Sequence, residues 1–256
     1  MYICSMGITN DVMEWRGGVI PEFPADRDVH LWRASLDRGP IAISRFRSVL
    51  QDDELERAAR FRFDVHRNRY VASRGILRIL LSGYLDLEAR EIAIVLTSHG
   101  KPELQRGQSV LRFNLSHAGD MGVFAFAAGR RVGVDVEETA RDVSFRQLAS
   151  RYFSPEEQAV LTNSSDADIR NVFYACWTRK EAYIKALGLG VTHGLDNFTV
   201  AIAPDAKPAI IQSKVDADAP ERWGMRAFVP ADGFAGALVA EGKDWSLRAF
   251  EFSPAE

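Results

Sequence analysis

The sequence predicts an α+β fold, in which helices and strands follow one another without the regular alternation of a doubly wound sheet. Residues 66–84 carry apolar side chains at helical spacing, whereas residues 29–36 alternate between apolar and polar as a strand does. Apolar residues make up 46% of the 256 residues and charged residues 26%, which is typical of a globular protein with a substantial core.

The first half of the chain supplies strands and two helices. Residues 1–28 show no clear periodicity and are expected to form an N-terminal extension or a flap. Asp52 or Asp53 can cap a first helix that ends near Phe61. The remaining expected elements are a strand at 29–36, a helix at 66–84 and strands at 92–96 and 110–115, with a turn at 98–102.

The second half of the chain is also predicted to contain both helices and strands. We predict that strands 123–127 and 132–136 pair with each other through a turn at Gly129. Ser154-Pro155-Glu156-Glu157 predicts a helix start, and a helix over 169–187 should end at Gly188 or Gly190. Further strands are expected near 196–203, 224–229, 234–240 and 246–252, with residues 204–222 forming a loop that leaves room for one short strand.

Composition excludes several classes of protein. No apolar run approaches the ~20 residues that span a bilayer, and the first residues lack the pattern of a secretory signal. Cys4 and Cys176 are far apart in sequence, so we expect two reduced thiols and a cytoplasmic protein that binds no membrane. A net charge of −3 argues against general binding of polyanions, and we expect no nucleic-acid partner.

Basic residues are concentrated in one segment. Residues 57–78 hold seven arginines against a single acid, Asp64. A solvated helix usually mixes charges of both signs, so this imbalance predicts an anionic partner. Phosphate is the natural candidate, because the guanidinium group matches its geometry with paired hydrogen bonds.

The segment from Trp177 to Lys185 carries an unusual helix face. Trp177, Glu181 and Lys185 are spaced by four residues and therefore share one side of the helix. Asp135 and Glu137 are two apart in an expected strand, so both side chains point to one face. Together with Glu181 they would form an oxygen-only shell that suits Mg²⁺ beside substrate phosphates. The alternatives are a solvated edge strand and, for Glu181 and Lys185, an ordinary surface ion pair.

Each of the other candidate residues could have either of two roles. Glu157 is either half of a capping box with Ser154 or a general base. Ser116 and His117 are adjacent and so do not form a nucleophile–base pair, which favours a phosphate contact or a structural histidine. Lys180 and Lys185 could neutralise phosphate or assist a leaving group beside the metal, or they could be ordinary surface charges. No P-loop, dinucleotide fingerprint, zinc spacing or nucleophile elbow is present.

Four motifs together resemble the 4′-phosphopantetheinyl transferases. They are Phe113-Asn114-Leu115-Ser116-His117, Gly133-Val134-Asp135-Val136-Glu137, Phe153-Ser154-Pro155-Glu156-Glu157 and the segment Trp177 to Lys185, within a resemblance that covers residues 29–203. The length is similar to that of the single-chain, Sfp-type subgroup. The resemblance implies two similar halves related by a pseudo-twofold axis, at 29–131 and 132–256, with the active site between them.

The resemblance also implies an activity and roles for individual residues. The family transfers 4′-phosphopantetheine from coenzyme A to a serine of an apo acyl or peptidyl carrier protein and releases adenosine 3′,5′-bisphosphate. Asp135, Glu137 and Glu181 match its ligands for Mg²⁺, with Mn²⁺ as the other ion, and Glu157 matches its base. The positions that match contacts to the coenzyme are Arg57, Arg74, Lys101, Ser116, His117, Lys180 and Lys185.

The sequence departs from the family pattern at one position, and two other functions could use the same charged residues. Ala118 stands where the family often has serine, so a hydrogen bond from that side chain is absent. A Mg²⁺-dependent phosphodiesterase could use the same carboxylates, and a non-enzymatic carrier-protein binder could use the arginines. We expect a monomer, because one chain carries both halves.

Overall fold

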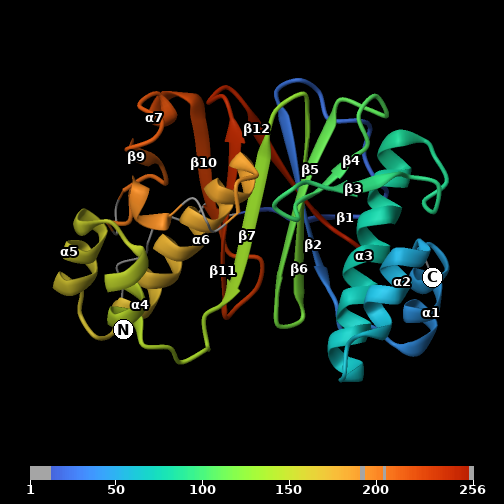
Figure 1. Ribbon diagram of the computed structural model, residues 1–256, viewed down its shortest axis with the longest axis horizontal. Coiled ribbons are helices and arrows are strands. Elements are labelled where there is room, and N and C mark those ends of the chain that lie inside the picture. Colours follow the sequence, from blue (N-terminus) through green and yellow to red (C-terminus); the bar gives the residue numbers. More distant parts are fainter. Residues whose placement is uncertain (1–12, 191–193, 204–205, 254–256) are drawn as a thin grey trace.

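The computed structural model describes residues 13–190, 194–203 and 206–253. It confirms the predicted α+β class: two sheets stand side by side in the centre, with one group of helices outside each of them (Figure 1).

The N-terminal half is built on a mixed sheet. Strands β5 (Leu111–Ala118), β6 (Met121–Ala128) and β2 (Asp28–Ser35) lie next to one another in that order. The chain end then returns, because β12 (Ser246–Glu251) adds to β2 in parallel and β1 (Arg16–Gly17) adds to β12. Residues from the two ends of the chain therefore complete the sheet of the first half.

Helices and a hairpin cover this sheet. The helices are α1 (Pro40–Ser48), α2 (Asp52–Ala59) and α3 (Asp64–Leu85), and the hairpin pairs β3 (Ile94–Leu96) with β4 (Pro102–Leu104). Helix α3 buries one side against the sheet, as the apolar spacing predicts. Its buried side chains include Val71, Ile76, Leu77, Leu80 and Leu81.

The C-terminal half repeats this arrangement. Strand β7 (Val132–Glu138) is the edge of a sheet with β11 (Phe234–Glu241) in the middle and β10 (Trp223–Phe228) beyond it. The helices are α4 (Phe145–Tyr152), α5 (Pro155–Asn163), α6 (Ile169–Leu187) and the short α7 (Ala219–Arg222). A short 3₁₀ turn at Leu195–Asn197 leads into the hairpin of β8 (Phe198–Val200) and β9 (Ile210–Ser213).

The two halves share one order of elements. Each begins with a strand, continues with two short helices, a long helix and a hairpin, and closes with two antiparallel strands. In each sheet the last of these strands lies between the first strand and the strand that precedes it in sequence. The topology thus contains a duplication that no sequence repeat reveals.

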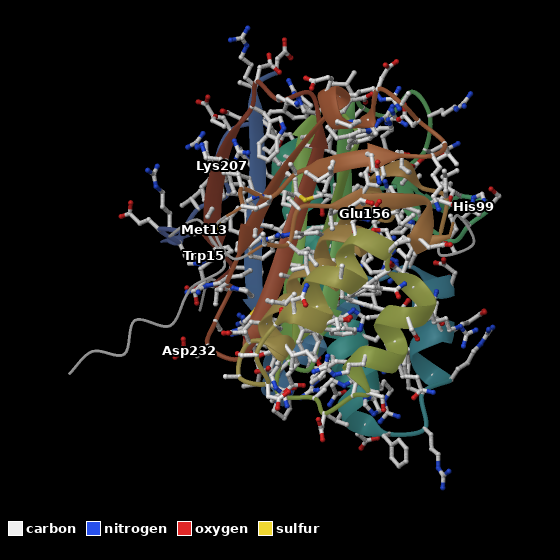
Figure 2. The ribbon with its side chains drawn as sticks, turned by 90° about the vertical axis from the view of Figure 1, so that its left-hand side faces the viewer. Met13, Trp15, His99, Glu156, Lys207 and Asp232 are labelled. Carbon is white, nitrogen blue, oxygen red and sulfur yellow. The ribbon has the colours of Figure 1, made fainter. Side chains whose placement is uncertain are left out.

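The halves meet where β5 lies beside β7. The backbone N–H of Val134 donates to the side-chain oxygen of Asn114 at 2.8 Å, which joins the two strands across the boundary. A shared apolar cluster, including Val123, Val134 and Leu238, fills the space between the sheets. Trp15 packs against this cluster on the side of the molecule away from His99 (Figure 2).

The structure corrects one predicted strand pairing. Strands β6 and β7 are consecutive, yet they do not pair: β6 is hydrogen-bonded to β2 and β5, and β7 pairs with β11. Both edges of β6 are therefore occupied, and Gly129 marks a crossing between the sheets.

Several shorter elements also differ from the sequence-based expectations. Helices α1, α4 and α7 were not predicted, whereas the one short strand allowed within residues 204–222 is present as β9. Cys176 is a buried free thiol, whereas Cys4 lies outside the described residues. Within the described ranges, no helix has the length and apolar character needed to cross a membrane.

Candidate active site

Helix α6 lies unusually close to strand β7, and Gly133 permits this approach. A Cβ atom at Gly133 would lie 2.1 Å from the carbonyl oxygen of Ala182. Gly133, Asp135 and Glu137 are alternate residues of one strand and share its face toward α6. The glycine of the G-x-D-x-E motif therefore lets the helix face meet the two carboxylates.

Asp135 is the centre of the site. It is 3% exposed, and its Oδ1 atom accepts hydrogen bonds from the Ser116 hydroxyl at 2.9 Å and the Lys185 ammonium at 2.6 Å. Lys185 also donates to the Ser116 oxygen at 2.8 Å. Three elements, β5, β7 and α6, thus contribute one residue each to a single cluster.

The negative charge of Asp135 acts on both Glu137 and Glu181. Burial, followed by the negative charge of Asp135, raises the pKa of both glutamates. Lys185 acts in the opposite direction on each of them. The site therefore concentrates negative charge that one lysine only partly offsets.

The donor set fits Mg²⁺, although its members do not yet converge. All three side chains offer oxygen, and the Oδ2 atom of Asp135 is buried without a hydrogen-bond partner. Among the described residues, however, no three His, Cys, Asp or Glu side chains form a group that could hold a metal ion. Binding one ion through all three would require the glutamates to draw closer to Asp135.

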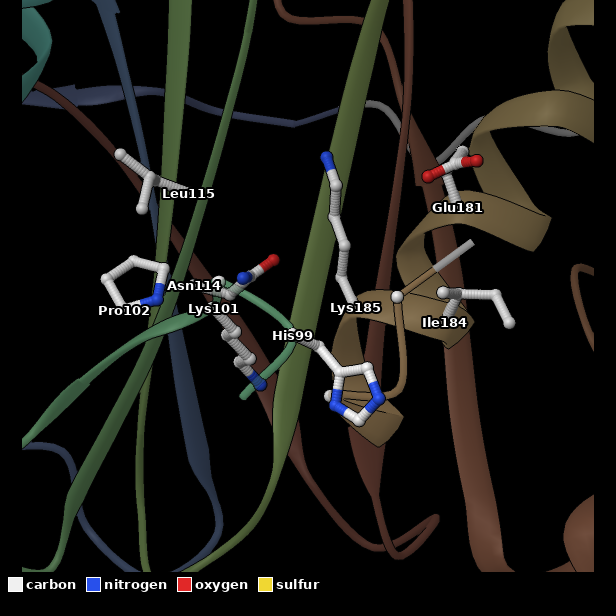
Figure 3. A pocket seen from close by; sticks show the side chains of 11 residues that line it. His99, Lys101, Pro102, Asn114, Leu115, Glu181, Ile184 and Lys185 are labelled. Atoms are coloured by element: carbon white, nitrogen blue, oxygen red, sulfur yellow. The ribbon is translucent and has the colours of Figure 1, made fainter. Parts of the chain in front are cut away.

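A pocket of about 280 Å³ opens beside this cluster, between the two halves (Figure 3). From the N-terminal half come the turn before β4 and part of β5; from the other half comes the end of α6. Its lining residues are His99, Gly100, Lys101, Pro102, Asn114, Leu115, Glu181, Ile184, Lys185, Gly188 and Gly190. Helix α6 ends here because Gly188 takes a left-handed conformation with φ of 73°, as the sequence predicted.

Lys101 brings a second ammonium group to the pocket. Its Nζ donates to the backbone oxygen of Val132 at 3.3 Å, and burial lowers its pKa to about 8. Sequence reasoning did not single out His99, which lies next to Gly190 across the boundary between the halves. Its place in the turn Ser98-His99-Gly100-Lys101-Pro102 was the available signal.

Ser116 and His117 take separate roles. Ser116 is buried and orients Asp135, whereas His117 is exposed on the other face of β5. Partial enclosure, then the positive charges of Lys185 and Arg69, lower the pKa of His117. His117 therefore lies within the electrostatic reach of Lys185 but outside the hydrogen-bonded cluster.

The two arginines expected near the coenzyme do not line the pocket. Arg74 donates to Glu54 at 2.7 Å, and Arg57 lies over the Tyr70 ring at 5.7 Å. Arg78 is fully buried and also donates to Glu54, at 2.5 Å. Glu54, the partner of Arg74 and Arg78, lies outside this basic segment, which weakens the inference of an anionic partner from local charge alone.

Glu157 and Lys180 lie in the core, away from the pocket lining. The capping box is present: the Ser154 backbone N–H donates to Glu157 Oε2 at 2.8 Å. Lys180 donates to the same oxygen at 2.8 Å, and the Val200 N–H donates to Oε1 at 2.7 Å. Glu157 is 1% exposed, so neither oxygen is open to a hydroxyl in the pocket.

The N-terminal half contains the counterpart of this buried pair. Glu54 closes the capping box of α2 as Glu157 closes that of α5. Arg78 of α3 donates to Glu54 and to the carbonyls of Ala89 and Ile92 before the first hairpin.

Lys180 of α6 makes the corresponding contacts in the second half. It donates to the carbonyl oxygens of Leu195 and Phe198, at the start of the second hairpin. A buried glutamate–cation pair is thus found in both halves, although only the second half carries the carboxylate cluster. The pair therefore belongs to the fold and not to the cluster.

Two family models match consecutive parts of the chain. The model described as 4′-phosphopantetheinyl transferase, N-terminal, matches residues 32–129. The model described as the 4′-phosphopantetheinyl transferase superfamily matches residues 131–239. The two matches meet near Arg130, between the two sheets.

Curated relatives are similar over most of the chain. The 4′-phosphopantetheinyl transferase HetI of Nostoc sp. is 36% identical over 88% of this chain and 92% of its own length. The phosphopantetheinyl transferase of Thraustochytrium sp. is 31% identical over 66% of this chain and 62% of its own. Sfp of Bacillus subtilis is 28% identical over 65% and 72% respectively. The chain therefore belongs to the 4′-phosphopantetheinyl transferase superfamily.

Proposed function

We propose that the pocket between the halves binds coenzyme A and that its 4′-phosphopantetheine arm is transferred to a serine of an apo acyl or peptidyl carrier protein. The observation that carries this proposal is the meeting of Ser116, Asp135 and Lys185 beside the pocket. It places a carboxylate, a hydroxyl and an ammonium group where a pyrophosphate can lie against both Lys101 and Lys185.

The residues divide the chemistry between them. Lys185 and Lys101 neutralise phosphate oxygens, and Asp135, Glu137 and Glu181 would hold Mg²⁺ or Mn²⁺. When bound, such an ion supplies a Lewis acid for the charge on the pyrophosphate. The serine oxygen forms its bond to the phosphorus that carries the pantetheine, while the bond from that phosphorus to the bridging oxygen breaks and adenosine 3′,5′-bisphosphate leaves.

Glu181 is the carboxylate that we propose as acceptor of the serine proton. It lines the pocket, and a carboxylate that holds a cation through one oxygen keeps its second oxygen available for a proton. Glu157 is enclosed in the core, and we assign it and Lys180 to the stability of the second half.

We further propose that the protein acts as a monomer in the cytoplasm. Both walls of the pocket come from a single chain, and Cys176 is a buried reduced thiol.

The test of this function is mass spectrometry of apo carrier proteins from several pathways after incubation with the protein, coenzyme A and Mg²⁺. We expect a phosphopantetheine adduct on the serine of at least one carrier. A parallel incubation without carrier distinguishes a hydrolase, which would consume coenzyme A alone. Absence of any adduct, or consumption without a carrier, contradicts the proposal.

Lys101 predicts a pH dependence of coenzyme binding. Its pKa is about 8 in the free protein, so the ammonium is charged at pH 7 and largely neutral at pH 9. A phosphate binds the charged form, and the affinity for coenzyme A should therefore fall by up to about tenfold for each pH unit above 8. Calorimetric titrations between pH 7 and 9 measure this change.

The matched control for this prediction is Lys101→Arg. Arginine stays charged throughout the range, so the variant should lose most of the decline above pH 8. An identical decline in both proteins would place the titrating group elsewhere.

A further inference from the structure

A second ion pair lies at the rim of the carboxylate cluster and belongs to none of the four motifs. Arg69 of α3 donates to both carboxylate oxygens of Asp37, at 2.6 Å from Nε and 2.8 Å from Nη2. Both partners reach solvent: the Arg69 side chain is 24% exposed and that of Asp37 is 51% exposed. A pair so placed is weak and exchangeable, in contrast to the buried Glu54–Arg78 pair.

The sheet register brings this pair to the end of the strand that carries Ser116 and His117. Strand β2 ends at Ser35, which pairs with Met121, and Met121 pairs with Ala118. The N–H of Leu36 donates to the carbonyl oxygen of Asp120 at 2.6 Å. Asp37 directly follows Leu36 in the sequence, and Leu36 is hydrogen-bonded to the turn that comes after His117.

Positive charge collects at this end of the sheet. Burial, and then the positive charges of Lys185 and Arg69, lower the pKa of His117. Lys185 is held by Asp135, and Arg69 is held by Asp37. Each cation near His117 thus has a carboxylate partner within the protein.

We propose that Arg69 and Asp37 form an exchangeable anion subsite, in which a phosphate group of coenzyme A displaces the Asp37 carboxylate from the Arg69 guanidinium. The bidentate contact with Asp37 already places Arg69 in the geometry that a phosphate requires. Asp37 then acts as an internal competitor. This inference rests on the function proposed above and adds a binding residue to it.

Exchange makes the two partners respond in opposite directions, which a purely structural pair does not. Arg69→Gln removes the phosphate contact and should weaken coenzyme A binding roughly 10- to 100-fold. Asp37→Asn keeps a hydrogen-bond acceptor but removes the competing charge, so binding should tighten by roughly three- to tenfold. The dissociation constants are measured by isothermal titration calorimetry.

Arg67 and Asp64 provide matched controls on the same helix. They form an exposed ion pair three residues apart, and neither is among the charges that act on His117. Arg67→Gln and Asp64→Asn should leave the dissociation constant unchanged. Thermal melting of all four variants confirms that each remains folded at the temperature of titration.

The phosphate is identified by repeating the titrations with 3′-dephospho-coenzyme A. Loss of the Arg69→Gln effect with this ligand assigns the 3′-phosphate, and persistence of the effect assigns the pyrophosphate; both results support exchange. If both variants weaken binding, or neither changes it, the subsite is overturned while coenzyme binding stands. If the unaltered protein does not bind coenzyme A, the proposed function itself fails and the subsite fails with it.

Discussion

Replacing Asp135 by asparagine is expected to lower the rate of phosphopantetheine transfer on the order of a thousandfold while the protein stays folded. Asparagine keeps the shape of the side chain and can still accept a hydrogen bond from Ser116. It removes the charge that holds Lys185 at 2.6 Å and that a divalent cation would need. Lys185 is 28% exposed on its side chain, so water can solvate the released ammonium and the fold is spared.

The measurement is a single-turnover transfer assay together with thermal melting. Glu138→Gln is the matched control, because Glu138 ends the same strand but points away from the face shared by Asp135 and Glu137. Its rate should equal that of the unaltered protein. Full activity of Asp135→Asn would refute the placement of the reaction at this cluster.

Breaking the buried Glu157–Lys180 pair is expected to cost stability instead of chemistry. Lys180→Met leaves the Glu157 carboxylate charged and without its cation in the core, which should lower the free energy of unfolding by about 3–5 kcal/mol. Glu157→Gln leaves the Lys180 ammonium without its carboxylate partner and should lower the free energy of unfolding by a similar amount. The double variant leaves no unpaired charge, and it should recover part of the loss.

Urea denaturation measures the stabilities, and transfer assays corrected for the folded fraction measure the chemistry. The duplicated fold supplies the control: Glu54→Gln breaks the corresponding contacts to Arg74 and Arg78, far from the carboxylate cluster, and should lose comparable stability. We expect the rate per folded molecule to be unchanged in Glu157→Gln. A selective loss of rate with normal stability would instead restore Glu157 as the general base.

The duplication also explains why, among the described residues, the carboxylate cluster occurs in the second half and has no counterpart in the first. On strand β7 the face toward α6 presents Gly133, Asp135 and Glu137. On β2 the corresponding face presents His30 and Trp32, which both contact the hydroxyl of Tyr84 on α3. The first half therefore fills this position with aromatic core, and its contribution to the pocket comes from β5 and the turn before β4.

Local patterns were sufficient for most long elements. The apolar spacing of α3 and the Gly188 terminus of α6 are determined by neighbours in sequence, and so is the capping box at Ser154. Local patterns could not predict that β6 and β7 remain unpaired. That outcome depends on β2, β5 and β11, which occupy the strand edges instead.

The sequence by itself determined the α+β class, the carboxylates with helix α6 beside them, and the membership of a family that the comparisons confirm. Only the tertiary structure decided which charged residues meet. It joined Ser116, Asp135 and Lys185 at the boundary of the halves, and it enclosed Glu157 with Lys180 in the core. The physical reason is that a charge acts on what lies within a few ångströms in space, and those neighbours come from distant parts of the chain.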